Sequence, residues 1–187
     1  TLNRAVEFFV KEPETIEWIR SFCPNSIFYD IGANIGVYSL FAGIVKDCIV
    51  YSFEPSVFNF KELVINTNLN NNANIIPYCI GLSDETEMTK LFLNNLNIGS
   101  SGHSVKESFD YDLKPVKKFN SQGVISLTLD DLIHSWKVPI PNHIKIDVDG
   151  IEHKIIAGAS NLLKRPELKS VLIELNTNKE AHQLIIK

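Results

Sequence analysis

The sequence predicts an α/β fold built on a mainly parallel sheet, and three observations support this. Five short apolar segments, rich in Val, Ile and aromatic residues, recur along the 187 residues. They lack the polar alternation of half-exposed strands, which is typical of strands covered on both faces. Helical patterns separate most of them and supply the crossovers that parallel strands need.

The expected elements follow in chain order. Residues 13–22 predict an amphipathic helix, because Pro13 stands at a helix start and apolar residues follow along one face. The five expected strands are SIFYD (26–30), CIVYSFE (48–54), NIIPYCI (74–80), HIKID (143–147) and SVLIE (170–174).

The alternation of strands and helices is interrupted between the third and fourth strands. Residues 87–93 and 123–129 have the pattern of an inserted strand pair, and residues 94–123 have few apolar anchors. Loops of this length are usually functional or mobile. We expect a flexible flap there, within a single domain over 1–187 that begins with a helical segment at 1–25.

Composition narrows the classes of partner and location. The net charge of −4 argues against a nucleic-acid partner, which normally requires a basic face. The longest apolar run is about half of what spans a bilayer. Cys23, Cys48 and Cys79 are odd in number and far apart, so we expect reduced core thiols and no metal site. These features predict a soluble, cytoplasmic protein without a membrane span.

The turn after the first strand, DIGANIG, has the form of a nucleotide-binding turn. The strand ends at Asp30, the chain turns through Gly32, and a helix begins near Gly36. Glycines let a ligand approach the backbone, and a helix start offers free N–H groups. The dinucleotide pattern G-x-G-x-x-G is not met, because the middle glycine is missing and an acid stands in front.

An acidic residue stands at or just after the end of every expected strand: Asp30, Glu54, Asp84, Asp147 and Glu174. Ligands of open parallel sheets lie at that edge. A row of carboxylates repels a pyrophosphate and attracts a cation rich in hydroxyls and amines, such as S-adenosylmethionine. Glu54 would accept both ribose hydroxyls, Asp30 would serve the amino-acid moiety directly or through water, and Asp84 would meet the adenine. A turn or cap role for Asp84 is equally open.

Candidates for acid–base chemistry follow the fourth strand. Transfer of a methyl group to an alcohol requires donor and acceptor in line, and a group that removes the alcohol proton. Asp147 and His153 are the candidates for that group, with Glu174 behind them. A helix-surface role for His153 is equally open, and Asp149 is better placed as a helix cap.

The chain resembles the FkbM-type methyltransferases, within the class I, Rossmann-like, S-adenosylmethionine-dependent enzymes. The matching segments, from about residue 28 to residue 176, are DIGANIGVYS, VYSFEPSVFNFKELVINTNLNN, GLSDE, SLTLDDLI and IKIDVDGIEHKIIAGA. The resemblance implies a three-layer fold with strand order 3-2-1-4-5, and S-adenosylhomocysteine as product. The cofactor contacts that it implies are Asp30, Gly32, Ala33, Asn34, Gly36, Glu54 and Asp84, with Asp147 facing the methyl-transfer site.

The resemblance also bears on the acceptor and the chain ends. It implies a flap at 97–104 that excludes water, and a small hydroxylated acceptor, first a sugar or glycoconjugate and then a polyketide-like or other metabolite. Class I enzymes usually end with an antiparallel strand pair after the fifth strand, whereas this sequence stops at Lys187. We therefore expect that pair to be missing.

Two alternatives stay open. Asp147 and Asp149 also fit the DxD pattern with which nucleotide-sugar glycosyltransferases hold a divalent metal, although such an enzyme has no evident use for Asp30 and Glu54. The other alternative is a cofactor-binding domain without turnover. The oligomeric state is not predicted.

Overall fold

A computed structural model describes residues 12–71, 74–93, 99, 104–105, 120–175, 183 and 185. Its main sheet has five parallel strands in the order β3-β2-β1-β8-β9. The strands are β1 (Ile27–Ile31), β2 (Ile49–Phe53), β3 (Ile75–Tyr78), β8 (His143–Ile146) and β9 (Ser170–Ile173). This is the expected 3-2-1-4-5 order, and each strand lies within two residues of its predicted bounds.

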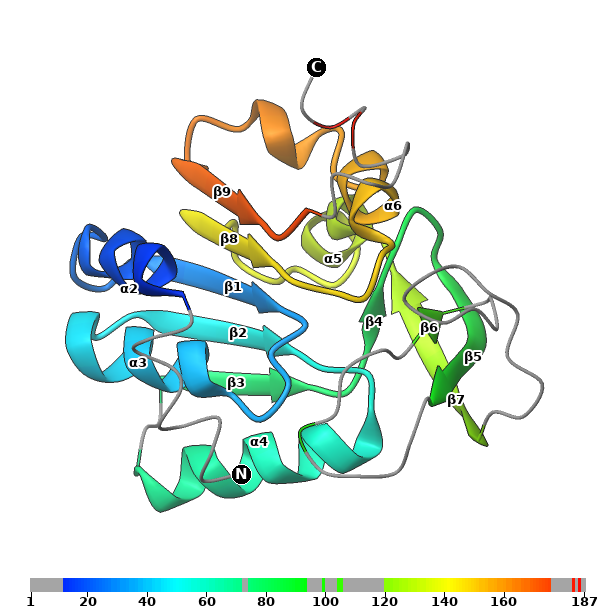
Figure 1. Cartoon of the computed structure of the whole chain (residues 1–187). Coiled ribbons are helices and arrows are strands. Elements are labelled where there is room, and N and C mark those ends of the chain that lie inside the picture. The colour runs from blue at the N-terminus through cyan, green and yellow to red at the C-terminus, as the bar shows by residue number, and fades with distance from the viewer. Residues whose placement is uncertain are drawn as a thin grey trace.

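Helices cover both faces of this sheet (Figure 1). Helices α2 (Pro13–Arg20) and α3 (Val37–Lys46) pack on the face that carries Phe28 and Val50. The opposite face packs Tyr29 and Ile144 against α5 (Leu129–His134), α6 (Glu152–Ala157) and the 3₁₀ turn η1 (Leu162–Lys164). Helix α4 (Val57–Leu69) runs beside β3. The three-layer α/β fold and the predicted first helix are confirmed.

A second sheet stands beyond the carboxyl ends of β1 to β3 (Figure 1). Its order is β4-β7-β5-β6, from β4 (Gly81–Leu82), β7 (Asn120–Leu127), β5 (Glu87–Leu93) and β6 (Ser104–Val105). Strands β5 and β7 are the predicted inserted pair, joined antiparallel. The predicted end at residue 129 is wrong, because the Thr128 hydroxyl caps α5 by accepting from the Asp131 N–H at 3.0 Å.

Parts of the sequence predictions fall outside the described residues. The predicted flap does so over most of its length, although its residues 120–123 belong to β7. Few residues are described after β9, so the expectation that a further strand pair is missing there stays a prediction.

The three cysteines are free, but only Cys48 is buried. The prediction of core thiols is wrong for Cys23 and Cys79, which are exposed because they follow the ends of α2 and β3 rather than lying within them. Among the described residues, no helix is both long and apolar enough to cross a membrane.

Candidate active site

Strand register brings the predicted acids together in two rows on the face of the sheet that carries α3. Residues two apart on a strand share a face. The inner row aligns Ser52, Asp30 and Lys145 on β2, β1 and β8. Two residues further on, at the carboxyl edge, the outer row contains Glu54, Gly32, Asp147 and Glu174. Backbone bonds continue the register past the strand ends, since the Asp147 N–H donates to Ile31 O at 3.0 Å and the Glu174 N–H to Ile146 O at 2.9 Å.

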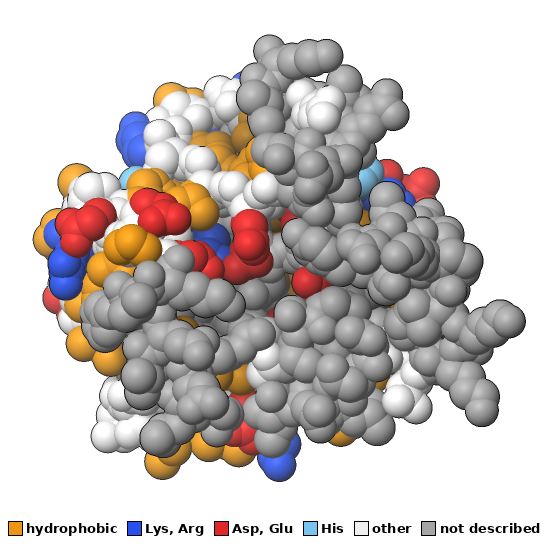
Figure 2. Space-filling view, in the orientation of Figure 1, with side chains coloured by type: hydrophobic (Ala, Val, Ile, Leu, Met, Phe, Trp, Pro, Cys, Tyr) orange, Lys and Arg blue, Asp and Glu red, His pale blue; other side chains and the backbone are white. Residues whose placement is uncertain are grey.

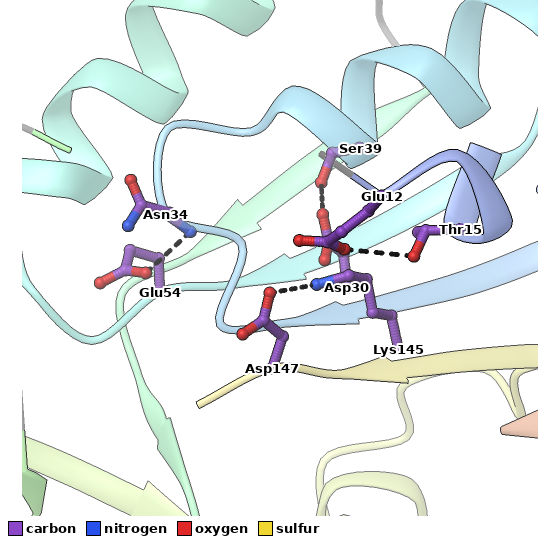
Figure 3. Close-up of polar contacts among 8 residues, drawn as sticks. All are labelled: Glu12, Thr15, Asp30, Asn34, Ser39, Glu54, Lys145 and Asp147. Atoms are coloured by element: carbon purple, nitrogen blue, oxygen red, sulfur yellow. Dashed lines mark hydrogen bonds and ion pairs between the residues drawn. The ribbon is translucent and has the colours of Figure 1, made fainter. Parts of the chain in front are cut away.

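Asp30 lies in the inner row and is fully buried. The Ser39 hydroxyl of α3 donates to Asp30 Oδ2 at 2.6 Å (Figure 3). It also lies 2.7 Å from the Ser52 hydroxyl. Burial raises the pKa of Asp30, while the Lys145 charge and the Ser39 hydrogen bond lower it. Within the described residues, Oδ1 is buried and has no hydrogen-bond partner. Contact between Asp30 and a cofactor stays a prediction.

The glycines of the turn permit close packing of protein against protein. Gly32 has φ of 80°, and a Cβ added there would lie 1.9 Å from the Asp147 carbonyl oxygen. Gly36 has φ of 86°, and its Cβ would lie 2.4 Å from Leu63 Cδ1. The N–H groups of Gly32 and Ala33 both donate to Phe53 O, at 2.9 and 3.1 Å. Approach of the backbone to a ligand, the sequence-based reason for these glycines, stays a prediction.

Glu54 is held in one orientation by the turn. It directly follows β2, and only 5% of the residue is exposed. Its Oε2 accepts from the Asn34 N–H at 2.8 Å, and its Oε1 accepts from the Ser56 N–H at 2.9 Å. Burial raises the pKa of Glu54 to about 7, although these hydrogen bonds oppose the shift. The Asn59 side chain also hydrogen-bonds this carboxylate. Because a carboxylate has about four lone-pair sites, these three donors leave acceptor capacity for a ribose hydroxyl.

Lys145 is the main feature that sequence reasoning missed. It is 1% exposed in β8, and its Nζ lies 2.5 Å from Asp147 Oδ2 (Figure 3). The same Nζ lies 4.5 Å from the centre of the Tyr38 ring. A lysine is seldom fully buried unless it is paired. A charged residue inside an apolar strand, HIKI, was the signal that could have revealed it.

Asp147 and Glu174 end the outer row on neighbouring strands. The Asp147 side chain is 30% exposed, and Glu174 is exposed. A hydrogen bond with Asp147, then the charge of Asp147 and burial, raise the pKa of Glu174 to about 8. Figure 2 shows acidic side chains gathered around a basic one near the middle of this view. The arrangement provides an ion pair with an adjacent proton-binding carboxyl group.

Two predicted residues lie in other elements. Asp84 is exposed in the turn between β4 and β5, where the Ser83 hydroxyl donates to its Oδ1 at 2.9 Å. Its Cα would lie 3.3 Å from a Cβ on Gly158, which places it beside the end of α6. His153 is partly buried in the first turn of α6. Adenine contact by Asp84 and catalysis by His153 stay predictions.

Known proteins resemble this chain over most of its length. The chain is 26% identical over 155 residues to the hexuronic acid methyltransferase AglP of Haloferax volcanii. The aligned region covers 81% of this chain and 56% of that protein. It is 24% identical over 174 residues to the 31-O-demethyl-FK506 methyltransferase FkbM of Streptomyces tacrolimicus. The aligned region covers 82% of this chain and 66% of that protein. The chain thus spans less than the full length of both relatives.

A solved structure shares the fold. The precorrin-6y C5,15-methyltransferase of Geobacter metallireducens GS-15 matches with a TM-score of 0.52 at 12% identity, over 89% of this chain and 63% of that one. The family model of the methyltransferase FkbM domain matches residues 30–187, from the last polar residue of β1 onward. The chain therefore belongs to the FkbM family of methyltransferases, whose cofactor is S-adenosylmethionine.

Proposed function

We propose that this chain transfers a methyl group from S-adenosylmethionine to a hydroxyl oxygen of a small acceptor. A sugar or glycoconjugate is the first candidate, and another small metabolite is the second. The observation that carries the proposal is the buried Glu54 carboxylate, which the Asn34 and Ser56 N–H groups and the Asn59 side chain hold in place with acceptor capacity left for a ribose hydroxyl. The names of the two relatives, for a hexuronic acid and for 31-O-demethyl-FK506, support a small oxygen-rich acceptor.

The described residues divide into holding and reacting roles. S-adenosylmethionine, when bound, supplies a methyl group on a positively charged sulfur. Glu54 would hold the ribose hydroxyls, and the glycine turn would set the depth of the site. The carboxylates of Asp30 and Asp147 would favour the cationic donor, with Lys145 keeping the two carboxylates from repelling each other. Most of the rate enhancement would come from holding donor and acceptor in line.

Two alternatives predict different ligands. A glycosyltransferase that used Asp147 and Asp149 would need a divalent metal, and the described residues contain no group of three or more His, Cys, Asp or Glu that could hold one. The family match favours methyl transfer over this reaction. A domain that binds the cofactor without turnover would bind S-adenosylhomocysteine and methylate no acceptor.

Calorimetric titration with S-adenosylhomocysteine tests the proposal. We expect micromolar binding by the wild type, and a loss of at least tenfold for Glu54→Ala. Glu14→Ala, on the exposed side of α2, is the matched control and should bind like the wild type. Asp84→Ala tests the adenine contact separately. Absence of binding by the folded wild type would contradict the proposal and would direct the search to nucleotide sugars with manganese.

A screen of hydroxylated acceptors then tests turnover. Formation of S-adenosylhomocysteine that depends on a sugar or another hydroxyl compound would support O-methylation. Binding of the cofactor product without turnover on any acceptor would instead favour the inactive-domain alternative.

A further inference from the structure

We propose that Glu174 is the general base that takes the proton from the acceptor hydroxyl, and that Asp147 and Lys145 position and polarise it. The inference rests on the proposed function, because it assigns a role within the same site. It also changes the order of the sequence-based candidates, in which Asp147 and His153 came first.

The positions of the three side chains carry the first step. Lys145 and Asp147 lie two residues apart on β8 and share a face, and Glu174 follows β9 in register with Asp147. Their exposure increases in the same order. The Lys145 side chain is 2% exposed, that of Asp147 is 30% exposed, and Glu174 is exposed. Of the three groups, Glu174 is therefore the one most open to an acceptor and to solvent.

The ion pair makes Asp147 a poor base. Its Oδ2 accepts from the Lys145 ammonium at 2.5 Å, and an opposite charge at this distance favours the ionised carboxylate. A carboxylate stabilised in this way has little tendency to take a proton from an alcohol. Its negative charge, however, acts on the neighbouring carboxyl group.

Glu174 has the opposite environment. Its hydrogen bond with Asp147 and the Asp147 charge raise its pKa to about 8, and partial desolvation of its carboxyl group and the Glu12 charge act in the same direction. The Lys145 charge opposes them. Asp30 in the inner row and Tyr38 of α3 also interact with Asp147. A general base is most effective when its pKa lies near the working pH, which Glu174 satisfies.

The proposed step balances in atoms and charge. The acceptor oxygen forms a bond to the methyl carbon while the carbon–sulfur bond breaks, and the bonding electron pair stays on sulfur. The hydroxyl proton passes to a Glu174 carboxylate oxygen. Because Glu174 is exposed, it can then release that proton to solvent.

A titration of the ligand-free protein tests the inference without any methyl transfer. With glutamate labelled with ¹³C at the side-chain carboxyl, one resonance should titrate near pH 8 and be absent in Glu174→Gln. In Asp147→Asn its midpoint should fall by at least one pH unit, because the hydrogen-bonded negative charge is removed. Asp149→Asn removes another acid that follows β8, whose charge acts on Glu54, and should leave the Glu174 midpoint in place. A Glu174 midpoint near 4.5 in the wild type would overturn the inference.

Kinetics complete the test with the acceptor found by the screen. We expect kcat/KM of the wild type to rise with pH through a midpoint near 8. Glu174→Gln should lose about 10²-fold or more in kcat and the pH dependence, yet bind S-adenosylhomocysteine like the wild type. Asp147→Asn should shift the midpoint to lower pH. Full activity of Glu174→Gln would overturn the role of Glu174 and leave the proposed function intact. If the wild type does not bind S-adenosylhomocysteine, the proposed function itself is contradicted.

Discussion

Burial of Glu54 should make the ligand-free protein less stable as the pH rises. The pKa of Glu54 is about 7 in the folded protein and 4.5 ordinarily, so the folded state binds this proton more tightly than the unfolded state. Below pH 4.5 the group is protonated in both states and has no effect. Between pH 4.5 and 7 the folded protein progressively loses stability relative to the unfolded chain. At about 1.4 kcal/mol per pH unit, the full loss is about 3 kcal/mol.

The assay is urea unfolding of the wild type and Glu54→Gln at pH 5, 6, 7 and 8. Glutamine keeps the size but cannot ionise, so the difference in unfolding free energy between the two proteins isolates Glu54 from Asp30 and Glu174, whose pKa values are also raised. From pH 5 to pH 8 the unfolding free energy of Glu54→Gln should rise by about 2–3 kcal/mol relative to that of the wild type. Glu14→Gln makes the same chemical change on the exposed surface of α2. A difference that stays constant to within about 0.5 kcal/mol would refute the reasoning.

Two further predictions concern packing around the site. Gly32→Ala should lower the unfolding free energy by about 2 kcal/mol or more, because the added Cβ would lie 1.9 Å from the Asp147 carbonyl oxygen and the backbone φ is 80°. Gly123→Ala is the control, because nothing lies within 4 Å of the added Cβ, and it should change the unfolding free energy by less than about 1 kcal/mol. Ser39→Ala should lower it by about 1–3 kcal/mol at pH 8 by removing the donor to buried Asp30. Chemical unfolding measures both, and wild-type stability of either variant would contradict the corresponding packing argument.

The sheet and its acidic edge could be predicted because they depend on local patterns. Apolar segments without polar alternation specify strands covered on both faces, and strand order follows from the family resemblance. The acids at residues 30, 54, 147 and 174 lie at one edge of the sheet because parallel strands place their carboxyl ends there. Alternation along β8 then puts Lys145 on the same face as Asp147.

Other features depend on contacts between distant segments and could not be predicted in this way. Asp84 was expected just after the third strand at the edge of the main sheet, but the chain leaves that sheet after Tyr78 and forms β4 in the second sheet. Gly32 is closely approached by Asp147, and Gly36 by Leu63, so neither position has room for a Cβ. No local sequence pattern reveals these contacts. The partner of Lys145 could be found only once its rotamer and the register were known.

The second sheet contributes to the site through the loop that carries Glu54. Gln122 of β7 donates to the Pro55 carbonyl oxygen at 2.7 Å and accepts from the Val57 N–H at 3.0 Å. Asn59, at the start of α4, hydrogen-bonds Glu54 and accepts from the Gly99 N–H at 2.9 Å. The insertion is thus fastened to the loop and the helix start that directly follow Glu54, the residue that is proposed to hold the ribose. Changes in the insertion should therefore alter the orientation of the Glu54 carboxylate, which links the part of the chain after β5 to the proposed ribose contact.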